Sequence, residues 1–336
     1  MDLEIDFVIL WVDGNDQAWQ KEYLFYKNQE KSNKHGINIT RFRDWDNLQY
    51  WFRSIEKNCP WVRKIHFVTC GHYPEWLNKS HPKLNLVKHS DFIDSKFLPT
   101  FSSHTIELNI HRIEGLSEKF VYFNDDFFIN KPLKPDFFFK NNLPCDHLVI
   151  DSLRQVGVDH FFGCIRHRSM ALANKYFKKK HVIKQIFFKV YNPLYGIGFI
   201  LNLLNYPMGN FSYLSTPHLP QAFRKSTFFE VWQCEQDFLE SVCLNKFRQA
   251  TDVNQYLFRN WHLLKGEFYP VYPYNRGLFK NVSTSNISLI IGNILESNSP
   301  MLCINDAEVT DDYDYLMDSL KSTFDIRYPQ KSSYEK

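Results

Sequence analysis

The sequence predicts an α/β fold built on a mostly parallel, twisted sheet. Apolar, strand-like segments alternate with amphipathic, helix-like segments over roughly the first 130 residues. Residues 119–129 then carry two adjacent carboxylates, Asp125 and Asp126, out of the end of an apolar strand. Ligands of open α/β sheets bind beyond the carboxyl ends of strands, so the acid pair indicates a binding site, although a polar turn would look the same.

The elements of the first half follow from local patterns. A strand is expected at 5–12 because this apolar run is closed by the turn residues Asp13 and Gly14. Residues 44–58 place apolar side chains at helical spacing after acidic residues, which predicts a helix. Two more strands are expected at 64–70 and 84–89, with a short helix at 74–78 between them.

A second helix is expected at 102–116, because isoleucines form one stripe between a serine cap at Ser102 and a stop at Gly115. The alternation fades after this region. We therefore expect an α/β half at 1–140 and a largely helical half at 141–325 that completes the site. The C-terminal sequence QKSSYEK is polar and is expected to be loose.

Residues 178–210 are apolar and aromatic, begin with three lysines and are interrupted by Pro193, Gly196 and Gly198. These breaks argue against one continuous spanning helix. Two interpretations remain: a helical lid folded over the core, or an interfacial segment in peripheral contact with an anionic membrane surface.

Composition narrows the class of protein. The chain has 336 residues, of which 44% are hydrophobic, so it can bury a sizeable core and is not disordered. A net charge of +3 is too small to indicate a nucleic-acid partner. Seven cysteines without a CxxC pair, and no signal peptide, predict reduced thiols in a cytoplasmic protein, which could also lie at the inner face of the plasma membrane.

Several clusters of polar residues accompany the acid pair. Asn124, which directly precedes the pair, is expected to be a further substrate contact. The turn after the first strand, Trp11, Val12, Asp13 and Gly14, offers backbone donors and an aromatic ring to a base or ribose. The cations Arg41, Arg43 and Arg53 could bind phosphate oxygens, although surface ion pairing explains them equally well.

Three further candidates come from separate segments. Glu107 and His111 are four residues apart on the predicted helix, a spacing that permits shared metal or proton chemistry. His218 lies between two prolines on a stiff loop. Arg248 and Asp252 follow on a probable helix. The position of these residues in the sequence does not by itself assign a role.

Taken together, these segments resemble the four ordered conserved regions of the Stealth family. The matching motifs are IDFVILWVDG, RFRDWDNLQYWFRSIEKN, LPTFSSHTIELNIHRIEGLSEKFVYFNDDFFI, TPHLPQAFRK with KFRQATDVNQ, and CINDAE. This family joins bacterial capsular and cell-wall polysaccharide phosphotransferases to the catalytic subunit of the animal N-acetylglucosamine-1-phosphotransferase. The chain reads TIE where the family has AIE, and WVDG where animal members have WVNG.

The resemblance implies a Rossmann-like, glycosyltransferase-A-like core whose first half binds a nucleotide sugar. It implies transfer of a hexose 1-phosphate from a UDP-sugar to an acceptor glycan, either free or lipid-linked, with UMP as the leaving group. The family's active-site residues fall on Glu107, Asp126, His218 and Arg248.

The expected mechanism assigns each of these groups a function. Asp126, helped by Asp125, would hold Mg²⁺ or Mn²⁺, and Arg248 would stabilise phosphoryl charge. His218 would be the general base or its orienting partner, with Glu107 as a positioning group. Two rivals remain open: a metal-dependent glycosyltransferase that releases UDP, and a non-catalytic glycan-binding assembly protein.

Overall fold

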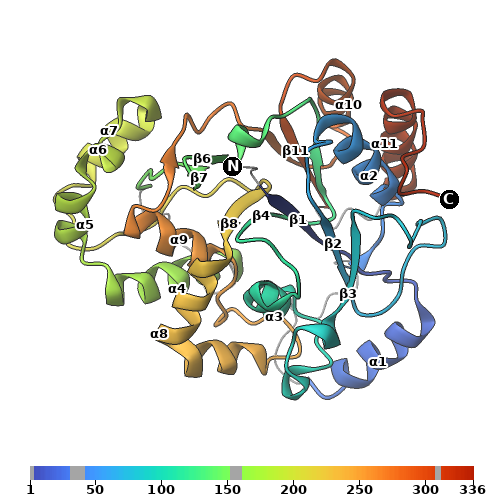
Figure 1. Cartoon of the computed structure of the whole chain (residues 1–336), viewed down its shortest axis with the longest axis horizontal. Coiled ribbons are helices and arrows are strands. Elements are labelled where there is room, and N and C mark those ends of the chain that lie inside the picture. Colours follow the sequence, from blue (N-terminus) through green and yellow to red (C-terminus); the bar gives the residue numbers. More distant parts are fainter. Residues whose placement is uncertain (1–3, 31–41, 152–160, 307–311) are drawn as a thin grey trace.

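The computed structural model describes residues 4–30, 42–151, 161–306 and 312–336. A five-stranded sheet in the order β3-β2-β1-β4-β8 forms its centre (Figure 1). The first four strands are parallel and β8 pairs antiparallel with β4. Their bounds are β1 Ile5–Leu10, β2 Ile65–Thr69, β3 Leu84–Lys88, β4 Lys119–Phe123 and β8 Gln221–Arg224. The α/β, Rossmann-like fold expected from the sequence is thus confirmed.

Helices cover both faces of this sheet. Side chains of β1 that point to one face pack with α2, α10 and α11 in one apolar cluster, and those that point to the other face pack with α3, α8 and α9. The helices are α1 Gln17–Lys27, α2 Leu48–Asn58, α3 Ser103–Asn109, α4 Phe161–Tyr176, α5 Lys179–Gln185, α6 Phe187–Val190, α7 Ile197–Leu204, α8 Lys225–Cys243, α9 Tyr256–Lys265, α10 Ile287–Glu296 and α11 Tyr313–Arg327.

Two small sheets extend the centre, in the orders β10-β11-β5 and β6-β7-β9. Their strands are β5 Phe127–Ile129, β6 Phe139–Lys140, β7 Leu143–Asp146, β9 Tyr269–Pro270, β10 Leu278–Asn281 and β11 Met301–Asn305. The pairing of β5 with β11 is antiparallel and sets Cys303 opposite Phe127. A late segment of the chain is therefore placed directly beside the acid pair.

Four local expectations need correction. Residues 119–129 are two strands, β4 and β5, with the acid pair in the turn between them. The helix expected at 102–116 ends at Asn109 and is followed by a 3₁₀ turn at Ile110–Arg112. His111 therefore packs in an apolar cluster and does not share a helical face with Glu107. Residues 74–78 form a turn, not a helix, and Leu77 bridges to Glu335.

The fourth correction concerns the C-terminus, which is docked onto the core instead of loose. Tyr334 is buried, and its ring packs against that of Phe52 on α2. The backbone N–H of Lys336 donates to the carbonyl of Trp76. The tail is therefore held by apolar burial that its polar composition did not predict.

The division into halves at residue 140 stays a prediction, and β8 from the second half completes the central sheet. All seven cysteines are free thiols. Across the described ranges, none of the helices combines the length and apolar character needed to cross a bilayer. Helices α5, α6 and α7 lie together at one edge of the molecule, away from α2 and α11 (Figure 1).

Candidate active site

A cavity of about 300 Å³ opens at the carboxyl ends of β1 and β4. The strand order 3-2-1-4 changes direction between these two strands, and such a switch point is where open α/β sheets bind ligands. Nine of the residues expected from the sequence line this cavity: Trp11, Val12, Arg43, Glu107, Asn124, Asp125, Asp126, His218 and Arg248.

The acid pair occupies the turn between β4 and β5. The backbone N–H of Phe127 donates to the carbonyl of Asn124 at 3.3 Å, which closes the turn. The backbone N–H of Ile304 on β11 donates to the carbonyl of Asp126 at 3.0 Å. Two adjacent carboxylates are therefore fixed from both sides, although their charges repel.

The pKa values of both acids lie above their usual range, although the positive charge of Arg248 lowers them. Removal from bulk water within the cleft, and then the charge of Asp44, raise the pKa of Asp125 to about 6. Burial and the charge of Asp125 raise the pKa of Asp126 to about 7. Within the described chain, Oδ1 of Asp126 is buried and accepts no hydrogen bond. These features fit a divalent cation with oxygen ligands.

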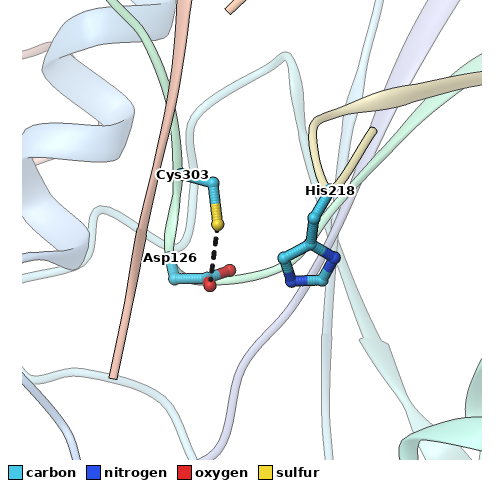
Figure 2. Close-up of side chains that lie close together, drawn as sticks. All are labelled: Asp126, His218 and Cys303. Atoms are coloured by element: carbon cyan, nitrogen blue, oxygen red, sulfur yellow. Dashed lines mark hydrogen bonds between the residues drawn. The ribbon is translucent and has the colours of Figure 1, made fainter. Parts of the chain in front are cut away.

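Cys303 and His218 lie beside Asp126, and the sequence alone did not indicate Cys303. The thiol donates to Oδ2 of Asp126 at 3.2 Å, and one donor atom from each of the three side chains lies within 4.8 Å of the others (Figure 2). Burial and the charge of Asp126 raise the pKa of Cys303 well above its usual range. Without a bound metal ion the thiol therefore keeps its proton.

His218 is held on the loop before β8, with its ring edge-on between Phe127 and Phe279. Its Nδ1 lies 3.1 Å from the hydroxyl of Tyr256. Burial, and then the positive charges of Arg166 and Arg248, lower the pKa of His218 to about 4. The imidazole is consequently neutral at pH 7 and can accept a proton or a metal ion.

Glu107 is anchored on α3 at the cavity wall. Its Oε1 accepts a hydrogen bond from the Ser103 hydroxyl at 2.8 Å, and its Oε2 accepts one from the backbone N–H of Gln255 at 3.1 Å. Only 4% of the side chain is exposed. This double anchoring suits a positioning group, since a carboxylate bound twice has little freedom to move.

Asp252 lies behind the cavity and orients two residues that line it. Its Oδ2 accepts hydrogen bonds from Nδ1 of His104 at 2.9 Å and from the backbone N–H of Gln249 at 2.7 Å. The first bond orients the imidazole of His104, which lines the cavity. The second holds Arg248 and Asp252 in a loop between α8 and α9, where the sequence predicts a helix. The sequence motif contained His104, but its spacing did not indicate this pairing.

The remaining expected residues lie elsewhere or are already paired. Arg43 lines the cavity but forms a bidentate ion pair with Asp306, which ties the second and last motifs together. Gly14 lies behind the cavity wall, where a Cβ atom would approach the carbonyl of Phe42 to 1.9 Å. The backbone N–H of Asp13 donates to His72. Arg41 lies outside the described residues.

Arg53 is on α2, where it binds the C-terminal tail. Its guanidinium donates to both carboxylate oxygens of Glu335 and to the carbonyl of Tyr328. The structure therefore does not bring Arg53 to the cavity. It forms an ion pair, as weighed for it, but this pair is largely buried and not at the surface.

We predict that Arg53→Ala reduces stability but not turnover. The substitution leaves the buried Glu335 carboxylate without its cation, which lowers the free energy of unfolding by about 3 kcal/mol. Urea denaturation and a transfer assay on the same preparation measure the two effects. A large loss of turnover in a folded variant would instead place Arg53 in the site.

Two Stealth family models match the chain: conserved region 1 over residues 4–31 and conserved region 2 over residues 41–146. A capsular polysaccharide phosphotransferase WcwK of Streptococcus pneumoniae is 39% identical, covering 99% of this chain and 98% of that protein. The exopolysaccharide phosphotransferase cps2G of Lactiplantibacillus plantarum is 36% identical, covering 99% and 96%. The receptor polysaccharide phosphotransferase WefC of Streptococcus gordonii is also 36% identical, covering 99% of both chains.

Among solved structures, the galactosyltransferase LgtC, in complex with donor and acceptor sugar analogs, aligns over 94% of this chain and 95% of its own. The TM-score is 0.40 and the sequence identity is 11%. A similarity at this level has no bearing on the activity.

Proposed function

Since the chain belongs to the Stealth family of polysaccharide phosphotransferases, we propose that it transfers a hexose 1-phosphate from a UDP-sugar to a hydroxyl group of an acceptor glycan. The product is a phosphodiester, and UMP leaves. Transfer of a sugar phosphate in polysaccharide synthesis is the general activity. The UDP-sugar donor, an N-acetylhexosamine among the candidates, and the release of UMP are the specific proposal.

The observation that carries this proposal is the convergence of separate motifs on one cavity. Glu107 and Asp126 come from one motif and His218 and Arg248 from a later part of the chain, and all four line the same 300 Å³ space. A cavity of this size accommodates part of a nucleotide sugar. A glycan-binding assembly protein would have no need for acids, imidazole and guanidinium together at one wall.

The acid pair would hold Mg²⁺ or Mn²⁺, because the unpartnered Oδ1 of Asp126 and the raised pKa values fit a divalent cation. When bound, such an ion neutralises charge on the donor diphosphate. Arg248 faces the same space and stabilises charge on the transferred phosphoryl oxygens. Phosphoryl transfer depends mainly on such positioning and neutralisation.

The acceptor hydroxyl must lose its proton as it attacks phosphorus. His218 lines the cavity as a neutral imidazole and serves as the general base or as its orienting partner. Glu107 fixes the geometry of the wall from α3. Asp252 and His104 supply a second oriented imidazole at the same cavity, which makes His104 an additional candidate for proton transfer.

The proposal is tested by incubating the protein with a panel of UDP-sugars and candidate acceptors and reading the products by phosphorus NMR. We expect a phosphodiester resonance together with a stoichiometric amount of UMP. Release of UDP with no phosphate in the product would identify a glycosyltransferase that attacks carbon. Saccharide binding without nucleotide consumption would identify a non-catalytic protein. Either outcome would overturn the proposal.

We predict that cation binding by the protein strengthens as the pH rises. The pKa values of Asp125 and Asp126 are raised to about 6 and about 7, so both acids hold protons at pH 5.5 and lose them by pH 8. A protonated carboxyl is a poor ligand, so Mn²⁺ should bind about tenfold or more tightly at pH 8 than at pH 5.5. Electron paramagnetic resonance titration of free Mn²⁺ measures this difference. Equal affinity at both pH values would exclude the acid pair as the site.

A further inference from the structure

Helix α7 is attached to the protein by its polar side. Asn202 is fully buried, its Nδ2 donates to the carbonyls of Leu148 and Val190, and its Oδ1 accepts from the backbone N–H of Ile150 at 2.6 Å. Gly198 packs so closely on Val149 that a Cβ atom would lie 2.6 Å from a methyl group. The two buried residues of α7 are therefore Asn202 and Gly198, neither of which has a large apolar side chain.

Most apolar side chains of α6 and α7 face outward, whereas Val190 on α6 is buried and Phe199 on α7 packs against the core. We call six of them the apolar outcrop: Phe187, Phe188, Ile197, Ile200, Leu203 and Leu204. All six are exposed, with exposed fractions that reach 84% for Phe188 and 69% for Leu204. Exposing six large apolar side chains on two short helices is costly in water and marks a site of interaction.

The segment that carries the apolar outcrop contains positive charges and no negative ones. Residues 161–210 contain eight lysine and arginine residues and no aspartate or glutamate, whereas the whole chain has a net charge of only +3. On α5, Lys180, His181 and Lys184 are exposed, while Val182 and Ile183 on the opposite side are buried. Within the described chain, Lys180 and Lys184 form no ion pair.

We propose that α5, α6 and α7 dock on the surface of an anionic phospholipid bilayer. The apolar outcrop would enter the interface between headgroups and acyl chains, and Lys180 and Lys184 of α5 would contact the lipid phosphates. A second copy of this chain fits less well, because a symmetric contact would bring two all-cationic segments together. This inference does not depend on the identity of the donor or of the acceptor.

The fold connects this surface to the cavity through a single helix. Helix α4 begins at Phe161, whose ring stacks on His104, and its neighbour Phe162 lines the cavity. Helix α4 has 16 residues, which corresponds to about 24 Å. It ends at α5 (Figure 1). The membrane anchor of an acceptor glycan would therefore lie about one length of α4 away from the cavity.

The test is flotation of the purified protein with vesicles. Wild type is expected to float with vesicles of phosphatidylglycerol and phosphatidylcholine, and not with phosphatidylcholine alone. High salt should weaken the association. The paired charge reversal Lys180→Glu with Lys184→Glu, and the pair Phe188→Ser with Leu204→Ser, should each weaken binding about tenfold or more. These side chains are exposed, so the variants should keep the fold, which circular dichroism verifies.

Matched controls place the same changes elsewhere on the surface. One control is the pair Lys21→Glu with Lys134→Glu, and the other is Phe25→Ser on α1. Both alter exposed residues outside α5, α6 and α7, so these variants should bind vesicles as wild type does. Failure of wild type to float, or equal losses in the control variants, would overturn the proposal. A third outcome would also overturn the proposal. If the wild type does not float but forms concentration-dependent dimers, and Phe188→Ser with Leu204→Ser abolishes these dimers, the face binds a second copy of the chain.

Discussion

Asp126→Asn is expected to lower the rate of sugar-phosphate transfer about 10²- to 10⁴-fold and to leave the fold intact. Asparagine has nearly the same shape as aspartate but carries no negative charge. It therefore cannot neutralise a divalent cation. The turn between β4 and β5 is closed by backbone hydrogen bonds, which the substitution leaves in place. Removal of one buried charge from a repelling pair should even favour the folded state without metal.

The measurement is UMP release under saturating donor, accompanied by thermal unfolding. Asp237→Asn on α8 is the matched control, because this carboxylate is exposed and lies outside the cavity, and it should keep wild-type turnover. Cys303→Ala removes only the thiol donor to Asp126 and should cost less, about tenfold. Wild-type transfer by Asp126→Asn would remove this carboxylate from the mechanism.

His218→Ala is expected to lower turnover about 10²- to 10⁴-fold as well, because it removes a neutral imidazole from the cavity wall. The ring packs edge-on against Phe127 and Phe279, so some stability is also lost, and thermal unfolding must accompany the assay. Tyr256→Phe removes the hydroxyl partner of Nδ1 and keeps the ring of Tyr256, so it should have a smaller effect than His218→Ala.

The control for His218 is His167→Ala on α4, a histidine that does not line the cavity. It should keep wild-type turnover. If His218→Ala retains full activity and His104→Ala does not, proton transfer belongs to the imidazole that Asp252 orients. Full activity in both variants would exclude these two imidazoles as the base and leave a carboxylate or His89, which also lines the cavity.

The sequence by itself determined the sheet and the chemical character of its edge. Apolar strands separated by helices specify a mostly parallel sheet, and the acids that follow β4 must lie at its carboxyl end. Both signals are local, because the side-chain periodicity of a strand or helix is set within a few residues. The four family motifs added Glu107, His218 and Arg248, and the structure brings all three to one cavity.

Only the tertiary structure decided the partners of these residues. Cys303 meets Asp126 across 177 positions of sequence, and Asp252 meets His104 across 148. Arg53 pairs with Glu335, and Leu203 and Leu204 of α7 face outward, and local patterns had left an alternative open in both cases. Such pairings depend on which distant segments of the chain pack against each other. The free energy of burying a polar or charged group depends on the residues that these segments place around it. Local periodicity contains no information about them.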